Sequence, residues 1–327
     1  AMPVIAWRLS RPPVLAKIDL SPDQTEFLRM LARKTWSFFD GHGGAQDNWL
    51  IPDNIQDRPS PSIAHRTSPT NLGLALLANL AAYDFGYLQA SRLLEKTHAS
   101  LGTMATLERY LGHFYNWYDT ITLKPLAPLY ISTVDSGNLA GHLLTLRPGL
   151  LELAQAPLLH PRTFQGCSDA LAVLRESVSE GSSAELEPFA DALDSVIQAG
   201  ALTLPQAKQH LDRLCALASA QIGHYAAPEL GQALWHCQAL LQQCEAARNE
   251  LALLAPWPGL ANAAGWRDIP ELHAMPTLQQ VADMARRVLP TLRERLSSPD
   301  ITSDEQTWLL ETELAVIAAC LLYTSDA

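Results

Sequence analysis

Residues 21–39 read SPDQTEFLRMLARKTWSFF, which combines a helix start signal with helical periodicity. Ser21 stands three residues before Gln24, the spacing of a capping box, in which two side chains satisfy backbone N–H groups left free at a helix N-terminus. Pro22 follows Ser21 at the position where a helix needs no N–H group. Apolar side chains then recur every three or four residues, at Phe27, Leu28, Leu31, Ala32 and Phe39. We therefore expect a helix over residues 21–40.

The same start signal recurs along the chain. Capping-box spacing places Thr203 before Gln206, Thr277 before Gln280 and Ser303 before Gln306, and Ser68 before Pro69 is interpreted as a further cap. Strand signals are sparse, and only residues 114–133, interrupted by two X-Pro pairs, indicate an extended, hairpin-like loop. The predicted helices are residues 21–40, 69–84, 87–109, 136–147, 164–178, 184–199, 204–220, 229–253, 277–297 and 304–319. The predicted fold class is all-α.

Composition limits the kinds of partner. The chain has 327 residues, with 23 Lys and Arg against 34 Asp and Glu, which gives a formal net charge of −11. This excess of carboxylates argues against nucleic acid or an anionic membrane surface as the main partner. Charged residues make up 17% of the chain and apolar residues 48%, which predicts a large core.

Several classes of site find no support in the sequence. The five cysteines are an odd number without paired spacing, so neither a disulfide framework nor a structural zinc site is predicted, and a reducing compartment is the simpler interpretation. Glycine-rich phosphate loops, HExxH and GxSxG are absent, so no cofactor and no metal are predicted. No apolar run approaches the roughly 18 residues of a membrane span, which predicts a soluble segment.

Both ends of the sequence are interpreted as truncated. The last eight residues, 320–327, can be back-translated as TGT CTC TTA TAC ACA TCT GAC GCT, which matches the transposon end used to prepare sequencing libraries. An apolar helical pattern that contains Leu309 and Ile317 is interrupted at this point. The hypothesis is that the natural sequence runs through Ala319 and that residues 320–327, Cys320 included, derive from the adapter.

A first polar and aromatic cluster lies between Trp49 and Gly73. It contains Asp53, Asn54, Arg66 and Asn71, and carboxylates, amides and a planar Arg next to Trp are the groups that hold sugar hydroxyls and the C–H face of a sugar ring. Two interpretations of Arg66 stay open, a sugar site and a structural ion pair. Asp53 and Asn54 also fit a simple turn, and for Ser68 the helix cap is favoured.

Two further clusters follow. Residues 112–120 read GHFYNWYDT, and Tyr115, Asn116, Trp117 and Asp119 fit either a sugar subsite or a loop in which aromatic rings pack and polar groups hold the backbone. In the third cluster Asp135 precedes Asn138 at the start of a predicted helix. Asp135 is interpreted first as an N-cap of that helix, and alternatively as a ligand for sugar hydroxyls beside Asn138.

Three strings resemble, in order, the glycoamylase-like middle region of cyclic β-1,2-glucan synthases. They are AHRTSPTNLGLALLANLAAYDFGYL (64–88), GHFYNWYDT (112–120) and LYISTVDSGNLAGHLLTLRPGL (129–150). The resemblance is close over about residues 4–150 and loose over the helices that follow. It implies the N-terminal part of an (α/α)6 barrel over residues 21–150, a helical bundle or insertion over 151–300 and the start of the next barrel helix over 301–319. Residues 1–20, with IAWRLSRP, look like a linker after a membrane segment of the parent protein.

The resemblance also implies a function. Such synthases are large inner-membrane proteins, so this segment would lie on the cytoplasmic side, with a β-1,2-glucan chain as ligand and the glycosyltransferase and phosphorylase-like domains of the same chain as partners. Ring closure by retaining transglycosylation needs two carboxylates about 5 to 5.5 Å apart. In that family the catalytic glutamates lie beyond this chain, so the catalytic residues are unknown and the segment alone is expected to be inactive. The alternative is a non-catalytic β-glucan-binding or scaffold module.

Overall fold

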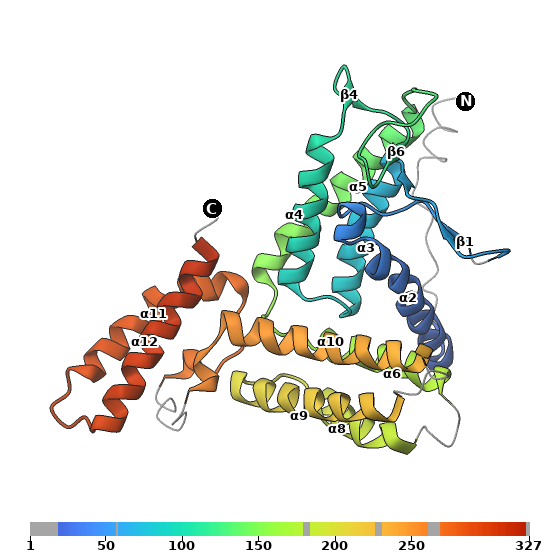
Figure 1. Cartoon of the computed structure of the whole chain (residues 1–327). Helices are drawn as coiled ribbons and strands as arrows, with labels where there is room; N and C mark the ends of the chain where they lie inside the picture. Colours follow the sequence, from blue (N-terminus) through green and yellow to red (C-terminus); the bar gives the residue numbers. More distant parts are fainter. Residues whose placement is uncertain (1–18, 57, 179–183, 226–230, 261–268, 325–327) are drawn as a thin grey trace, which may run out of the picture.

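The computed structural model describes residues 19–56, 58–178, 184–225, 231–260 and 269–324 (Figure 1). Helices account for most of these residues, and every strand in them is two residues long, so the predicted all-α class is confirmed. The ten long helices match the ten predicted ones. They are α2 (Pro22–His42), α3 (Pro69–Phe85), α4 (Ala90–Thr106), α5 (Thr133–Glu152), α6 (Arg162–Ser177), α8 (Glu187–Ala199), α9 (Leu204–Ile222), α10 (Gly231–Leu254), α11 (Leu278–Leu296) and α12 (Ser303–Thr324).

Short elements connect the helices. The 3₁₀ turns are η1 (Ala45–Asp47), η2 (Leu153–Gln155), η3 (Ala184–Leu186), η4 (Gly223–Tyr225), η6 (Trp257–Gly259) and η8 (Pro270–Leu272). The strands are β1 (Ile55–Gln56), β2 (Ser62–Ile63), β3 (Arg66–Thr67), β4 (Arg109–Tyr110), β5 (His113–Phe114) and β6 (Tyr118–Asp119). Each pairs antiparallel with one other, as β1–β2, β3–β6 and β4–β5.

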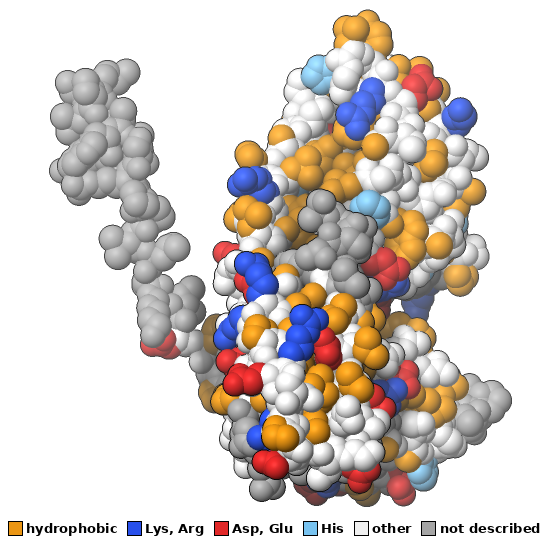
Figure 2. Space-filling model, turned by 90° about the vertical axis from the view of Figure 1, so that its left-hand side faces the viewer, with side chains coloured by type: hydrophobic (Ala, Val, Ile, Leu, Met, Phe, Trp, Pro, Cys, Tyr) orange, Lys and Arg blue, Asp and Glu red, His pale blue; other side chains and the backbone are white. Residues whose placement is uncertain are grey.

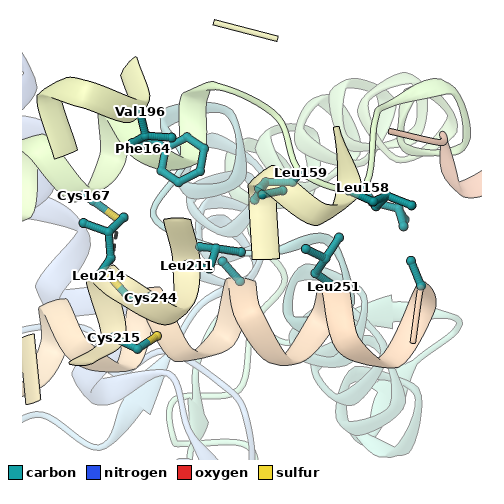
Figure 3. Packing of buried hydrophobic residues seen from close by; sticks show 14 of the residues in the cluster. Leu158, Leu159, Phe164, Cys167, Val196, Leu211, Leu214, Cys215, Cys244 and Leu251 are labelled. Atoms are coloured by element: carbon teal, nitrogen blue, oxygen red, sulfur yellow. Dashed lines mark hydrogen bonds between the residues drawn. The ribbon is translucent and has the colours of Figure 1, made fainter. Parts of the chain in front are cut away.

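The helices form two groups and a separate pair. Helices α3, α4 and α5 pack together in the upper part of Figure 1, α6, α8, α9 and α10 form a layer beneath them, and α11 packs against α12 at one side. The larger apolar core runs through the lower layer and the α11–α12 pair, and Figure 3 shows part of it, from Phe164 of α6 to Leu251 of α10. A smaller core, with Leu76 of α3, Leu139 of α5 and Tyr118 of β6, lies under the polar clusters and fixes the elements that carry them.

The end of α3 packs closely against the backbone of the first turns of α6. Gly86, which ends α3 with φ of +81°, has its carbonyl oxygen 2.3 Å from the position that a Cβ at Gly166 of α6 would occupy. The same carbonyl accepts a hydrogen bond of 2.9 Å from Nε2 of Gln243 in α10. Helices α3, α4 and α5 are therefore joined to the layer beneath them at a contact that only glycine permits.

Most predicted caps are confirmed. Ser21, Thr203 and Thr277 each form both hydrogen bonds of a capping box, and Oγ of Ser68 accepts from the backbone N–H of Asn71. The prediction for Ser303 is wrong, because α12 already begins at this residue. Oγ1 of Thr302 accepts from the N–H of Glu305 instead, since Thr302 also stands three residues before an acidic side chain.

Several helix boundaries differ from the prediction: α8 begins at Glu187 instead of 184, α12 ends at Thr324 instead of 319, and α4 and α5 also differ. The helix predicted over 87–109 begins only at Ala90, because the left-handed Gly86 and an extended Gln89 separate it from α3. The helix predicted over 136–147 runs from Thr133 to Glu152 and continues through Pro148, whose neighbour Gly149 packs on Leu80 of α3. The hairpin-like loop within 114–133 is confirmed by an antiparallel bridge between Tyr118 and Pro125.

Parts of two further predictions lie outside the described residues. These are residues 1–18 of the predicted linker and residues 325–327 of the expected adapter-derived tail. Across the ranges that the structure describes, every helix falls short of the length and apolarity that a bilayer crossing requires.

Candidate functional site

The pairing of β3 with β6 joins the first two sequence clusters. Arg66 lies opposite Asp119 and Thr67 lies opposite Tyr118. Tyr118 is completely buried, and its hydroxyl donates to the carbonyl of Glu108 (2.7 Å) and accepts from the N–H of Tyr115 (2.8 Å). A buried tyrosine with both hydrogen bonds satisfied holds the 112–120 loop against the strand that carries Arg66.

Asp53 organises the first cluster. Its Oδ2 accepts from Nη2 (3.1 Å) and Nε (3.3 Å) of Arg66 and from Nδ2 of Asn54 (2.9 Å). Its Oδ1 accepts from Nδ2 of Asn71 in α3 (3.1 Å). The Asp53 carboxylate thus bonds side chains from β3 and α3 in addition to that of its neighbour Asn54. Arg66 does form an ion pair, yet its side chain remains 50% exposed.

Trp117 connects the first cluster with the second. The Arg66 guanidinium lies over the Trp117 ring, with Cζ 4.9 Å from the ring centre. In the amide orientation that satisfies all its neighbours, Asn116 accepts from Nε1 of Trp117 (2.9 Å) and from the Tyr130 hydroxyl (2.7 Å), and its Nδ2 donates to Oδ2 of Asp135 (2.9 Å). Asn116 is only 5% exposed, so these bonds set its orientation and that of the indole.

Asp135 connects the second cluster with the third and with α3. Its Oδ1 accepts from Oγ1 of Thr70 (2.7 Å), and Oγ1 of Thr70 in turn accepts from Nδ2 of Asn138 (3.0 Å). Together with the Arg66–Trp117 contact, these bonds join eight of the ten predicted site residues in one network. Its members are Asp53, Asn54, Arg66, Asn71, Asn116, Trp117, Asp135 and Asn138.

The N-cap interpretation of Asp135 is wrong. Helix α5 begins two residues earlier than Asp135, and the capping hydrogen bond runs from the N–H of Asp135 to Oγ of Ser132 (3.1 Å). Partial burial by itself would raise the pKa of Asp135, but hydrogen bonds from Ser132, Thr70 and Ser68 outweigh it and lower the pKa below its ordinary value. Asp135 is therefore held as an anion.

The lowered pKa of Asp135 predicts how stability depends on pH. A carboxyl group whose pKa is lower in the folded state stabilises that state above its unfolded pKa, near 4, and this contribution is lost as pH falls through the folded pKa. We expect Asp135→Asn to lower the free energy of unfolding at pH 7 and to flatten its acid dependence below about pH 4. Urea titrations of both proteins between pH 2.5 and 7 measure this. Parallel pH profiles for the two would contradict it.

Tyr115 and Asp119 do not join the network. The Asp119 carboxylate accepts from the N–H groups of Thr122 (2.7 Å) and Ile121 (3.0 Å), and these bonds, that of Thr122 foremost, lower its pKa. Asp119 therefore holds a turn, as one of the two interpretations from the sequence had it. Tyr115 is half-buried, and its ring lies edge-on to Tyr118 with the ring centres 6.4 Å apart.

Three residues that form hydrogen bonds with members of the network were not predicted as site residues. Thr70 links Asp135 with Asn138, Tyr130 bonds Asn116, and Ser132 caps α5. All three lie in the strings that resemble the glucan synthases. Hydroxyl side chains are common in first helical turns and in aromatic loops, so the sequence alone does not distinguish these three as site residues. Beside the network, the buried Asp47 accepts from Oγ1 of Thr120 and contacts Nδ1 of His65 (2.8 Å), and these bonds anchor the chain next to β3.

The network supplies binding groups. Asp119 and Asp135 both have lowered pKa values, so neither serves as a proton donor near neutral pH. Among the described residues, burial raises the pKa of Glu250, but this carboxylate accepts from the N–H of Ser91 (2.6 Å) and caps α4 from α10. Anionic oxygens, amides, a half-exposed Arg and an indole are groups that bind hydroxyl-rich ligands.

Comparison with known proteins shows a relative of this chain among glucan synthases. Over 182 residues, or 55% of its length, the chain is 38% identical to the cyclic beta-(1,2)-glucan synthase NdvB of Rhizobium meliloti (strain 1021). The aligned stretch spans 6% of the length of that synthase. No family model matches the chain. The chain is thus related in sequence to a small part of a much larger glucan synthase.

Proposed function

We propose that the chain is part of a cyclic β-1,2-glucan synthase and that its network of eight side chains binds the β-1,2-glucan chain. The observation that carries the proposal is the convergence of three sequence segments on one connected set of polar and aromatic groups. Arg66, Trp117 and Asn138 come from β3, the loop before β6 and α5, which lie far apart in sequence. The relation to the Rhizobium synthase supports the choice of ligand.

The chemistry of the network suits a sugar. A glucose unit offers hydroxyl groups on its rim, which need acceptors such as Asp53 and donors such as Arg66, and C–H faces that pack on an indole such as Trp117. Asn138 and Arg66 are exposed, so both can reach a ligand from outside. Asn116, Asp135 and Thr70 form the support beneath them, because their hydrogen bonds go to one another.

The role proposed for this region is to hold the glucan while the ring is closed. Retaining transglycosylation would use a pair of glutamates from the parent protein, outside this chain, and a sugar hydroxyl would resolve the glycosyl-enzyme. The glycoamylase-like region would be an (α/α)6 barrel, to which α2–α5 contribute. Apolar side chains left exposed on α2 and α5 support this, among them Phe27, Leu31, Leu144 and Leu151. The glycosyltransferase and phosphorylase-like partners, and a position at the cytoplasmic side of the inner membrane, belong to the same proposal.

The alternative function is a non-catalytic glucan-binding or scaffold module. The lowered pKa values of Asp119 and Asp135 favour it, because the described site supplies anionic acceptors and no proton donor of raised pKa. Both functions require the same binding event. They differ in whether the completed parent region loses ring closure when its own glutamates are replaced.

The test is binding of linear β-1,2-gluco-oligosaccharides to the chain, measured by isothermal titration calorimetry. We expect Trp117→Ala to weaken binding about 5- to 150-fold, since loss of one aromatic platform costs roughly 1 to 3 kcal/mol. Trp235→Ala is the matched control, because Trp235 is a half-exposed tryptophan of α10 outside the network. Equal affinities of both variants and the parent chain, or no binding by any of them, would refute the proposal.

A further inference from the structure

Arg33 of α2 is a buried cation without a hydrogen-bond partner among the described residues. Its side chain is 7% exposed, its Nε is fully enclosed, and its guanidinium lies near the Tyr87 ring, whose centre is 5.4 Å from Cζ. A guanidinium carries five N–H donors and does not deprotonate in proteins. A buried charge of this kind costs several kcal/mol unless an acceptor compensates it.

The carboxylates around Arg33 are bound to other cations. Asp169 pairs with Arg29 (2.8 Å) and also accepts from the Tyr87 hydroxyl (2.9 Å). Asp40 pairs with Nζ of Lys96 (3.4 Å), which is itself almost completely buried.

A third carboxylate, Glu176 of α6, pairs with Lys34. The cluster thus places four cations, at Arg29, Arg33, Lys34 and Lys96, against three carboxylates. Asp40 and Asp169 favour the charge of Arg33 at a distance, but among the described residues neither forms a hydrogen bond with it. The buried Nε–H of Arg33 therefore lacks an acceptor, which a small anion would supply.

A small cavity lies beside Arg33, between α2, α6 and α10. Arg33 and Lys34 line it from α2, Val173 from α6, and Trp235 and His236 from α10. The space open to the centre of a water-sized sphere is about 10 Å³, which holds one atom-sized species and excludes phosphate or a sugar. Burial and the charges of Arg33 and Lys34 lower the pKa of His236, which fits a positive potential at the cavity.

We propose that this cavity is a binding site for a small monovalent anion of the halide class, held by the Arg33 guanidinium and faced by Lys34 and His236. The anion supplies the acceptor that the buried Nε–H of Arg33 lacks. Because it contacts side chains of α2 and α10, it joins α2 to the lower helical layer. The site is separate from the glucan network and does not depend on the proposed function.

The first experiment is a chloride titration of the full chain at constant ionic strength, with gluconate, too large for the cavity, as the balancing anion. A single site in the folded state lowers the unfolding equilibrium constant about tenfold for each tenfold rise in chloride above its Kd. We expect this dependence in the wild-type chain, its loss in Arg33→Met, and its retention in Arg213→Met, which removes an exposed arginine of α9.

The second experiment is independent of whether Arg33→Met folds. Crystals of the wild-type chain soaked in bromide are expected to show an anomalous peak within hydrogen-bond distance of the Arg33 guanidinium. A water molecule in place of the peak, or equal stability of the wild-type chain in chloride and gluconate, would overturn the proposal. Chloride dependence that persists unchanged in Arg33→Met would overturn it as well.

Discussion

Replacing Gly86 by alanine is expected to lower the free energy of unfolding by at least about 3 kcal/mol. Gly86 has φ of +81°, a conformation that costs an L-residue with a side chain roughly 1 to 2 kcal/mol. In addition, the new Cβ would lie 1.9 Å from the carbonyl oxygen of Arg162 and 2.9 Å from the backbone nitrogen of Thr163. Both contacts are with backbone atoms of α6, so the helix itself must move, and the effect is measured by urea unfolding followed by circular dichroism.

Gly102 provides the matched control. It lies within α4, and a Cβ placed there meets no atom within 4 Å. Gly102→Ala is expected to raise the free energy of unfolding by up to about 1 kcal/mol, because alanine favours the helix. If Gly86→Ala matched this gain, the close α3–α6 contact would be refuted.

Removing the Asp169 carboxylate is the second substitution with a large expected effect. Asp169 is 5% exposed and accepts from Nε of Arg29 (2.9 Å) and from the Tyr87 hydroxyl (2.9 Å). Asp169→Ala removes the carboxylate that pairs with Arg29 and that also favours the charge of the buried Arg33. Breaking a buried pair costs about 3 to 5 kcal/mol, and because Arg29 is 24% exposed we expect about 2 to 4 kcal/mol.

The control for Asp169→Ala is Glu95→Ala, which removes the same charge from an exposed pair. Oε2 of Glu95 lies 2.6 Å from Nη1 of Arg92, which stands one turn earlier in α4. Exposed pairs of this kind contribute little, so the change in unfolding free energy is expected to stay within about 0.5 kcal/mol. Similar losses for both variants would show that α2 is not fixed to α6 through Asp169.

The helices could be predicted because their signals are local. A capping box such as Ser21 with Gln24 involves only four consecutive residues, and the apolar repeat that follows it lies within one helix. Both can therefore be recognised without knowledge of the fold. The errors also have local causes. Thr302 and Ser132 compete with Ser303 and Asp135 for the same capping role, and a one-residue or three-residue shift keeps the spacing that predicts a helix start.

The candidate site was predicted as a set of residues rather than as an arrangement. Aromatic and amide side chains clustered in loops indicate a surface that binds a ligand or packs against another part of the protein. Eight of the ten predicted residues do lie together. Tyr115 and Asp119 could not be separated from them in advance. They stand in the same loop as Asn116 and Trp117, but Asp119 accepts from the N–H groups of Thr122 and Ile121, and Tyr115 lies edge-on to Tyr118.

The sequence by itself determined the all-α class, the ten helices and the polar segments, because each depends on interactions between residues at most a few turns apart. Only the tertiary structure decided that Asp135 bonds Thr70, 65 positions away, that Arg66 lies over Trp117, and that Nε of Arg33 is buried without an acceptor. These outcomes depend on which helices pack side by side and how closely. Hydrogen bonds and ion pairs act over a few ångströms, so partners distant in the chain are chosen by packing and not by spacing in the sequence.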